Sequence, residues 1–298
     1  MTKNRDKIRT VLFATDLSEE SARATKWLRW LSTRHHSKIF VLYVLNLLLA
    51  GMSQEELEKE KRAANQQFSD FLRKHQLNRS QFDAGLLVGD PAELVTKFVK
   101  IHGIRLLVLG SQATGVNRLI KGSVSEEIFR SVDCPVLVLG PNARRGPASI
   151  HPRRLLFATD LTETEPFAWR RLENLIKEDP SCEIMIVHFL PTAAQSVVER
   201  YSVRKSLQLQ LIESVPSSLR NRITDVVVEH CAPVEGVLEF ARDYGADLIV
   251  LEVRDAGPFT RAATHRPDSI IHQVISSAPC PVVTIRYPTV RNRSAREH

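Results

Sequence analysis

The chain has 298 residues, of which 43% are apolar and 25% are charged, and its formal net charge is +7. This length suits two domains of roughly 100 to 200 residues each. No apolar run reaches the roughly 18 residues that a membrane-spanning helix needs. The charged start leads directly into a strand pattern rather than an apolar signal region. We therefore expect a cytoplasmic protein without a membrane partner.

The distribution of charge and cysteine excludes further classes. Much of the positive charge lies in a connector near the middle of the chain and in the C-terminal tail. No helix-turn-helix, zinc-finger or aromatic-basic RNA-binding pattern accompanies it, so we expect no nucleic-acid partner. The four cysteines are far apart and form no Cys-x-x-Cys pair, which argues against a zinc site or a disulfide framework. Cys134 and Cys280, each before Pro-Val, are expected to be buried and reduced.

Short β-branched runs predict five strands in the first half, and longer amphipathic stretches between them predict helices. Helix starts are marked by Ser18, by Ser53 with Glu56 three residues later, and by Pro91. A fourth helix is expected over residues 123–131. The alternation of strands and helices predicts an open parallel sheet with helices on both faces. The strands are expected at residues 10–15, 39–45, 81–88, 106–110 and 135–139.

The second half repeats this order of elements and part of the sequence. Segment 13–18 returns with one change as 157–162, and segment 134–136 returns unchanged as 280–282. Such self-similarity predicts a duplicated domain. Strands are expected in this half at residues 154–159, 183–189, 224–229, 248–251 and 282–286.

The domain boundaries follow from the repeat and from the composition of the segment between the copies. We expect a first domain over residues 1–141 and a second over 153–298. A linker rich in Pro, Gly and Arg, residues 142–152, would join them.

A glycine-bearing loop follows the strand that ends at Gly110. A strand, a glycine loop and a helix start form a general design for holding phosphate, because backbone N–H groups and the positive helix end converge on the anion. We expect Gly110 to leave room for a ligand and Gly115 to allow a tight turn. Gly122 and Ser123 would open the next helix with free amides and a hydroxyl. The spacing is neither a Walker A loop nor a dinucleotide fingerprint.

This loop resembles the Gly-x2-Gly-x9-Gly-Ser/Thr signature of the universal stress protein (UspA) family. The start at residues 15–18, the turn at 89–93 and the Cys-Pro-Val segment at 134–138 match that family in the same order. The resemblance covers almost the whole chain as two fused copies. It implies two tandem Rossmann-like domains of the adenine nucleotide α-hydrolase type, each with an open five-stranded parallel sheet.

The resemblance also implies that the first domain binds ATP or a related adenine nucleotide. Carried onto this sequence, the adenosine side falls at Ala14, Asp16 and Val44. The phosphate side falls at Gly110, Gly122 and Ser123. Asp16 and Ser123 offer oxygen ligands of the kind that Mg²⁺ prefers beside a triphosphate, but a single carboxylate is thin support, so we assign no metal-ligating residue.

Two departures in the first domain bear on this assignment. The loop from Gly110 to Gly122 is one residue shorter than the family pattern, and Ala113 stands where the second glycine belongs. An alanine forced to positive φ would be strained by about 1 kcal/mol or more, although Gly115 offers an alternative turn. The alternative hypothesis is that this loop binds no nucleotide and only joins the strand to the helix.

The second domain departs further from the family pattern. Glu252 replaces the glycine after the fourth strand, and Pro267-Asp268 replaces the Gly-Ser pair. A carboxylate there repels phosphate, and proline removes an amide donor. We expect no ATP in this domain, a capping or loop-ordering role for Asp160, and a packing or hydrogen-bonding role for His188.

Three classes of function remain after these observations. The first is a stress-response regulatory protein that binds an adenine nucleotide and unidentified protein partners. The second is an interaction scaffold that binds no nucleotide. The third is a nucleotide hydrolase, but no nucleophile with a positioned base is found, so we expect no enzyme activity and no catalytic residue. The two halves would pair as an intramolecular pseudo-dimer, and a homodimer stays open.

Overall fold

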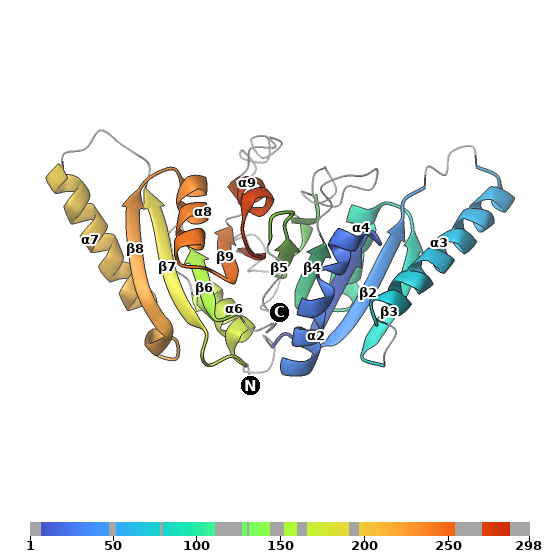
Figure 1. Ribbon diagram of the computed structural model, residues 1–298, viewed down its shortest axis with the longest axis horizontal. Coiled ribbons are helices and arrows are strands. Elements are labelled where there is room, and N and C mark those ends of the chain that lie inside the picture. Colours follow the sequence, from blue (N-terminus) through green and yellow to red (C-terminus); the bar gives the residue numbers. More distant parts are fainter. Residues whose placement is uncertain are drawn as a thin grey trace, which may run out of the picture. The chain divides into compact units, whose positions relative to one another are not determined.

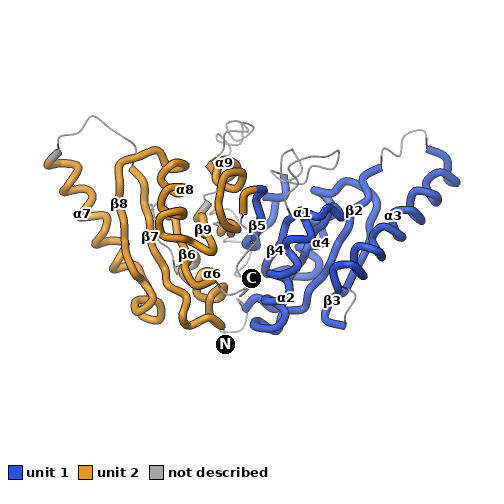
Figure 2. Tube along the Cα trace, in the orientation of Figure 1, with its two compact units in different colours: residues 1–141 blue, residues 142–298 orange. Residues whose placement is uncertain are grey.

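The computed structural model describes residues 7–47, 52–77, 80–110, 127–129, 131–143, 152–159, 166–190, 197–253 and 270–286. The chain divides into two compact units, residues 1–141 and 142–298, which Figure 2 colours separately. Most of the predicted linker, residues 144–151, lies outside the described residues, so its extent stays a prediction.

The first unit is a parallel sheet whose strands alternate along the chain with helices (Figure 1). Its strands follow the spatial order β3-β2-β1-β4-β5, and each neighbouring pair is parallel. The strands are β1 (Thr10–Thr15), β2 (Lys38–Leu45), β3 (Phe82–Val88), β4 (Leu106–Gly110) and β5 (Val136–Leu139). The helices are α1 (Glu19–Ala22), α2 (Thr25–Arg34), α3 (Gln54–Lys74) and α4 (Pro91–Ile101).

The helix starts of the first unit confirm the predicted caps. Ser18 accepts a hydrogen bond from the Ser21 amide at the start of α1. Ser53 and Glu56 form a complete capping box at the start of α3. Pro91 occupies the first turn of α4. The single helix predicted after Ser18 is instead two, α1 and α2, and of the predicted helix over residues 123–131 only 127–129 and 131 are described and helical.

Helices cover both faces of the first sheet. Phe40 of β2 contacts Phe98 of α4, whereas Tyr43 of the same strand contacts Phe68 of α3. Residues 40 and 43 have opposite parity in the strand, and successive side chains point to opposite faces. The two helices therefore lie on opposite faces. Such double cover explains why β1 and β4 in the middle of the sheet are almost wholly buried.

The second unit has the same topology, with strand order β8-β7-β6-β9-β10 and parallel neighbours. Its strands are β6 (Arg154–Ala158), β7 (Glu183–Leu190), β8 (Ile223–His230), β9 (Leu248–Val253) and β10 (Val282–Arg286). Its helices are α6 (Pro166–Ile176), α7 (Val197–Ser214), α8 (Pro233–Asp243) and α9 (Ile270–Ser277), with a short 3₁₀ turn η1 (Arg220–Arg222).

At one equivalent, partly buried pair of positions, the small residue and the large residue are interchanged between the two units. In the first unit, a Cβ on Gly89 would lie 3.1 Å from Cδ1 of Leu94. In the second, the same two repeat positions hold Cys231 and Gly236, so the small residue has moved onto the helix. A Cβ on Gly236 would lie 2.5 Å from the Phe189 ring and 2.7 Å from the Cys231 sulfur. Each unit thus has its own combination of large and small side chains at these two positions.

The helices of the two units also bear on membrane association. Within the described residues, none of the helices is both long enough and apolar enough to span a membrane.

Candidate functional site

The topology of the first sheet places the predicted site residues along one edge. β1 lies between β2 and β4, and the chain winds outward from β1 in both directions. In open parallel sheets, ligands bind at the carboxyl ends of the strands at such a switch point. Asp16 follows β1, Val44 is the penultimate residue of β2, and Gly110 ends β4. Ala14 lies deeper in β1 and is only 2% exposed.

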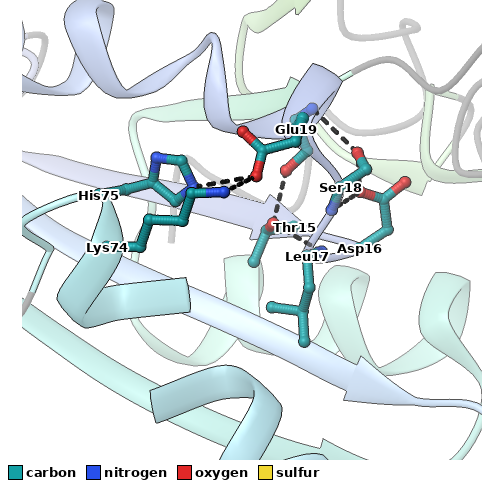
Figure 3. A network of polar contacts seen from close by, with 8 residues as sticks. Thr15, Asp16, Leu17, Ser18, Glu19, Lys74 and His75 are labelled. Carbon is teal, nitrogen blue, oxygen red and sulfur yellow. Dashed lines mark hydrogen bonds and ion pairs between the residues drawn. The ribbon is translucent and has the colours of Figure 1, made fainter. Parts of the chain in front are cut away.

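The turn from β1 into α1 is held by its own side chains (Figure 3). The Leu17 amide donates to Oγ1 of Thr15 over 3.0 Å, and the Ser18 amide donates to Oδ1 of Asp16 over 3.0 Å. The Ser18 hydroxyl donates to the same Oδ1 over 2.6 Å. Buried Thr15 and Ser21 share a hydroxyl hydrogen bond of 2.5 Å. The Leu17 and Ser18 amides just before α1 are therefore bonded to side chains of the turn itself, and the Ser21 amide is bonded to the Ser18 hydroxyl.

The backbone of this turn is strained at one residue. Leu17 has φ = 65°, in the left-handed region that a branched side chain rarely adopts. Such a conformation costs roughly 1–2 kcal/mol in an L-residue. The strain turns the amides of Leu17 and Ser18 back toward the side chains of Thr15 and Asp16. Backbone strain of this kind tends to persist where a site is held in a fixed geometry.

The second carboxylate oxygen of Asp16 is buried, and it has no hydrogen-bond partner among the residues that the structure describes. Burial raises the pKa of Asp16 above its usual value, although the hydrogen bonds from Ser18 oppose that effect. Burial, and to a lesser extent the negative charge of Asp16, raises the pKa of Tyr43, which lies on the adjacent strand. An acceptor oxygen that is desolvated and unsatisfied costs free energy unless a donor arrives. A hydrogen-bond donor that reached this oxygen would remove that cost.

Gly110 is small for a reason that the sequence did not reveal. A Cβ at this position would lie 2.2 Å from Cα of Ser21 and 2.6 Å from its Cβ. Helix α1 therefore packs directly against the end of β4, and glycine is required there whether or not a ligand binds. The loop residues Ala113, Gly115, Gly122 and Ser123 lie outside the described residues, so their predicted role at a phosphate stays a prediction.

Helix α1 is also tied to the end of α3, on the side that faces away from Asp16 in Figure 3. The Lys74 ammonium donates to the carboxylate of Glu19, and Nε2 of His75 lies 3.9 Å from the same carboxylate. Burial holds the pKa of His75 below its usual value. Nothing in the sequence pattern connected Glu19 with Lys74, because they lie 55 positions apart and belong to different helices.

The chemistry available for a metal is limited. Within the described ranges, no group of three or more His, Cys, Asp or Glu side chains is placed to hold a metal ion. Asp16 contributes a single carboxylate, and Ser123, its predicted partner toward Mg²⁺, is not described. All four cysteines are free thiols, and Cys134 and Cys280 are buried, as predicted.

Comparison with known proteins identifies the fold and the repeat. A sequence profile described as "Universal stress protein family" matches residues 7–140 and again residues 151–286. The chain belongs to the universal stress protein family. The two matches confirm both the predicted family and the predicted pair of tandem domains.

Individual family members are distant in sequence. Two universal stress proteins from Methanocaldococcus jannaschii are 25% and 24% identical to this chain over 150 and 147 residues. Each alignment spans 43% of this chain, and 93% and 80% of the respective relatives. Each relative thus matches about half of this chain.

Solved structures agree on the fold. A universal stress protein from Archaeoglobus fulgidus shares 20% identity and a TM-score of 0.65, with 95% of this chain and 98% of that chain covered. This likeness extends the common fold across both universal stress protein domains. A further universal stress protein, crystallised in complex with cAMP, is 18% identical over 44% of this chain and 95% of its own, with a TM-score of 0.34.

In the second universal stress protein domain, different side chains lie at the carboxyl ends of the equivalent strands. Glu252 occupies the position of Gly110, and its carboxylate accepts a hydrogen bond from the Thr159 hydroxyl. Nδ1 of His188 donates to the Thr159 carbonyl over 2.8 Å, and His188 is buried. The predicted hydrogen-bonding role of His188 is confirmed. Asp160 lies outside the described residues, so its predicted capping role remains a prediction.

Proposed function

We propose that the first domain of this universal stress protein binds ATP or a related adenine nucleotide at the carboxyl ends of β1, β2 and β4. The observation that carries the proposal is the buried second oxygen of Asp16 at the switch point of the sheet, which none of the described side chains or amides bonds. A desolvated acceptor in such a place favours a ligand that offers a hydrogen-bond donor.

The chemistry of the turn favours one orientation of that ligand. A carboxylate repels phosphate but accepts hydrogen bonds from the hydroxyl and amino groups of adenosine. The amides of the β1–α1 turn are already bonded to Thr15 and Asp16, so this turn offers phosphate little. We place adenosine beside Ala14, Asp16 and Val44. The phosphates would extend toward Gly110, Gly115, Gly122 and Ser123, with Mg²⁺ as a further candidate.

Repulsion between carboxylate and phosphate also indicates that the second domain binds no nucleotide and has a structural role. The carboxylate of Glu252 stands at the end of β9, where the phosphates of a nucleotide would approach. Its bond from Thr159 holds it there. Like charges at short range in a partly buried place are costly. We therefore propose one nucleotide per chain.

The proposed role is regulatory rather than catalytic. A nucleotide would alter the affinity for protein partners by binding one arrangement of the first domain better than another. Pairing of the two domains as an intramolecular pseudo-dimer, alone or in a homodimer, belongs to the same proposal. Turnover of ATP that depends on Asp16 would instead favour a hydrolase.

Titration of the full chain with ATP and with cAMP tests the proposal; cAMP is included because one family member has been crystallised with it. Asp16→Asn keeps an oxygen for Ser18 but puts an amino group where the unpartnered oxygen was. We expect a stoichiometry of one and at least a tenfold loss of affinity in Asp16→Asn, because hydrogen bonds to charged groups contribute about 1.5–3 kcal/mol.

The matched control is Asp160→Asn, the repeat-equivalent change in the second domain, which should leave the affinity unchanged. Equal affinity in wild type and Asp16→Asn would refute the assignment. If instead neither nucleotide raises the melting temperature at any concentration, the scaffold reading is favoured, because a ligand at 100 times its Kd adds about 2.7 kcal/mol of stability.

A further inference from the structure

Helix α7 of the second domain carries an exposed apolar stripe, made of Val198, Tyr201, Leu209 and Ile212. These side chains are 75%, 62%, 50% and 49% exposed, respectively. With 3.6 residues per turn they fall within about 80° of the helix circumference. Large apolar side chains gathered on one line of a surface helix are typical of an interaction surface.

Helix α7 runs alongside β8 (Figure 1), and side-chain contacts on another side of the helix fix its rotation on the sheet. Leu211 is fully buried. Arg204 forms an ion pair with Glu229 of β8 over 3.0 Å, and the Gln208 amide donates to the Val226 carbonyl of β8 over 2.9 Å. Because these contacts hold one side of the helix on β8, the apolar stripe cannot turn inward to become part of the core.

The equivalent helix of the first domain provides an internal comparison. α3 also crosses between the second and third strands of its sheet, yet no large apolar side chain on it is exposed. Its exposed residues are charged or polar apart from Ala63. The stripe on α7 is therefore not a requirement of the fold, since the same place in the same fold is polar in the other copy.

The width of the stripe and the charge within it indicate whether a membrane, a second copy of the chain or a helix of another protein fits it best. A membrane-surface helix has a broad apolar face, whereas a narrow stripe is typical of a seam between two helices. Lys205 lies on the same line, four residues from both Tyr201 and Leu209, and it is exposed. A second copy matched along the stripe would bring two Lys205 ammonium groups together, in either a parallel or an antiparallel arrangement. Like charges facing each other across an interface are costly.

We propose that the α7 stripe binds an amphipathic helix of another protein, with apolar residues that pack on the stripe and a carboxylate that faces Lys205. Recognition of a helix through side chains at three- and four-residue spacing is a common mode of peptide binding. A polar residue within such a seam sets partner choice and register. The proposal is independent of nucleotide binding, because all of these residues belong to the second domain.

Two synthetic peptides test the proposal against the full chain by fluorescence anisotropy. Each is a labelled 18-residue helix with leucines matching the apolar spacing of α7, and they differ only in a central Glu or Lys. We expect wild type to bind the Glu peptide at least tenfold more tightly than the Lys peptide. Lys205→Glu should reverse that preference, and Tyr201→Ala should weaken both interactions. Arg62→Glu on α3 is the matched control and should change neither.

Every other outcome counts against the proposal. Equal binding of the two peptides, or binding of neither, would refute the role of Lys205. Concentration-dependent dimerisation lost in Leu209→Ser would indicate a second copy as the occupant. Binding to anionic vesicles, lost in the same variant, would indicate a membrane. Circular dichroism of each variant distinguishes a lost contact from a lost fold.

Discussion

The close approach of α1 to the end of β4 predicts that Gly110→Ala destabilises the first domain even without a ligand. The new Cβ would lie 2.2 Å from the Cα of Ser21 and 3.0 Å from its carbonyl oxygen. Both are backbone atoms, so no side-chain rotation relieves the clash, and α1 or β4 must shift. Overpacking of a well-packed core costs typically about 1–3 kcal/mol. For a domain of this size, each kcal/mol lowers the melting temperature by about 3 °C.

The assay must report on the first domain alone, since two domains need not unfold together. Of the three tryptophans, Trp27 and Trp30 lie in the first unit and Trp169 in the second. In a Trp169→Phe background, urea unfolding followed by fluorescence reads only the first domain. We expect a lower midpoint with an unchanged slope.

Gly85→Ala is the matched control, because an added Cβ there meets nothing within 4 Å. It should leave the free energy of unfolding within about 0.5 kcal/mol of wild type. Equal midpoints for Gly110→Ala and Gly85→Ala would contradict the close packing. Loss of nucleotide binding without loss of stability in Gly110→Ala would instead assign this glycine to the ligand.

Four further predictions follow from features of both domains. Gly236→Ala should lower the stability of the second domain by about 1–3 kcal/mol, and adding Phe189→Val should restore part of it, as a double-mutant cycle would measure. Ser53→Ala should cost about 1 kcal/mol in urea unfolding through loss of the capping box. Burial raises the pKa of Cys182 to about 12, so this thiol should resist alkylation at pH 8 until the chain is denatured. Burial raises the pKa of Asp16 in the folded protein above the value of 3.8 that applies to the unfolded chain, so the native state binds this proton more tightly. The stability that this group contributes therefore falls as the pH rises from 3.8 through the folded pKa. Asp16→Asn should remove that fall, as melting curves at a series of pH values would show.

The element order was predictable because its signals are local. Three strands, at residues 10–15, 106–110 and 282–286, have the predicted bounds, and the others differ by one or two residues at an end. Runs of β-branched residues identify the buried strands, and Ser53 and Pro91 mark helix starts between them, so each segment can be assigned as strand or helix. The break between α1 and α2 was not predicted, since the apolar spacing continues across it.

The site was predictable only in part, because its chemistry depends on contacts between distant segments. Asp16 was found through its motif, but its unpartnered oxygen depends on which side chains close over it. Gly110 was assigned to a ligand, whereas its nearest neighbour is Ser21, brought there by the fold. The apolar residues of α7 are spread around the helix rather than gathered on one face, so the sequence did not show that Tyr201 would be exposed.

The interchange of small and large residues between positions 89 and 94 of the first domain and positions 231 and 236 of the second bears on how a duplicated gene diverges. Changing Gly236 alone to leucine would bring the new side chain against Phe189 and Cys231, so this step toward the first copy is tolerated only after those two side chains have become smaller. A successful graft of the first domain's ligand edge onto the second would have to carry positions 189, 231 and 236 together. Once such interlocking changes accumulate, recombination between the copies yields misfits, and the two halves become free to specialise.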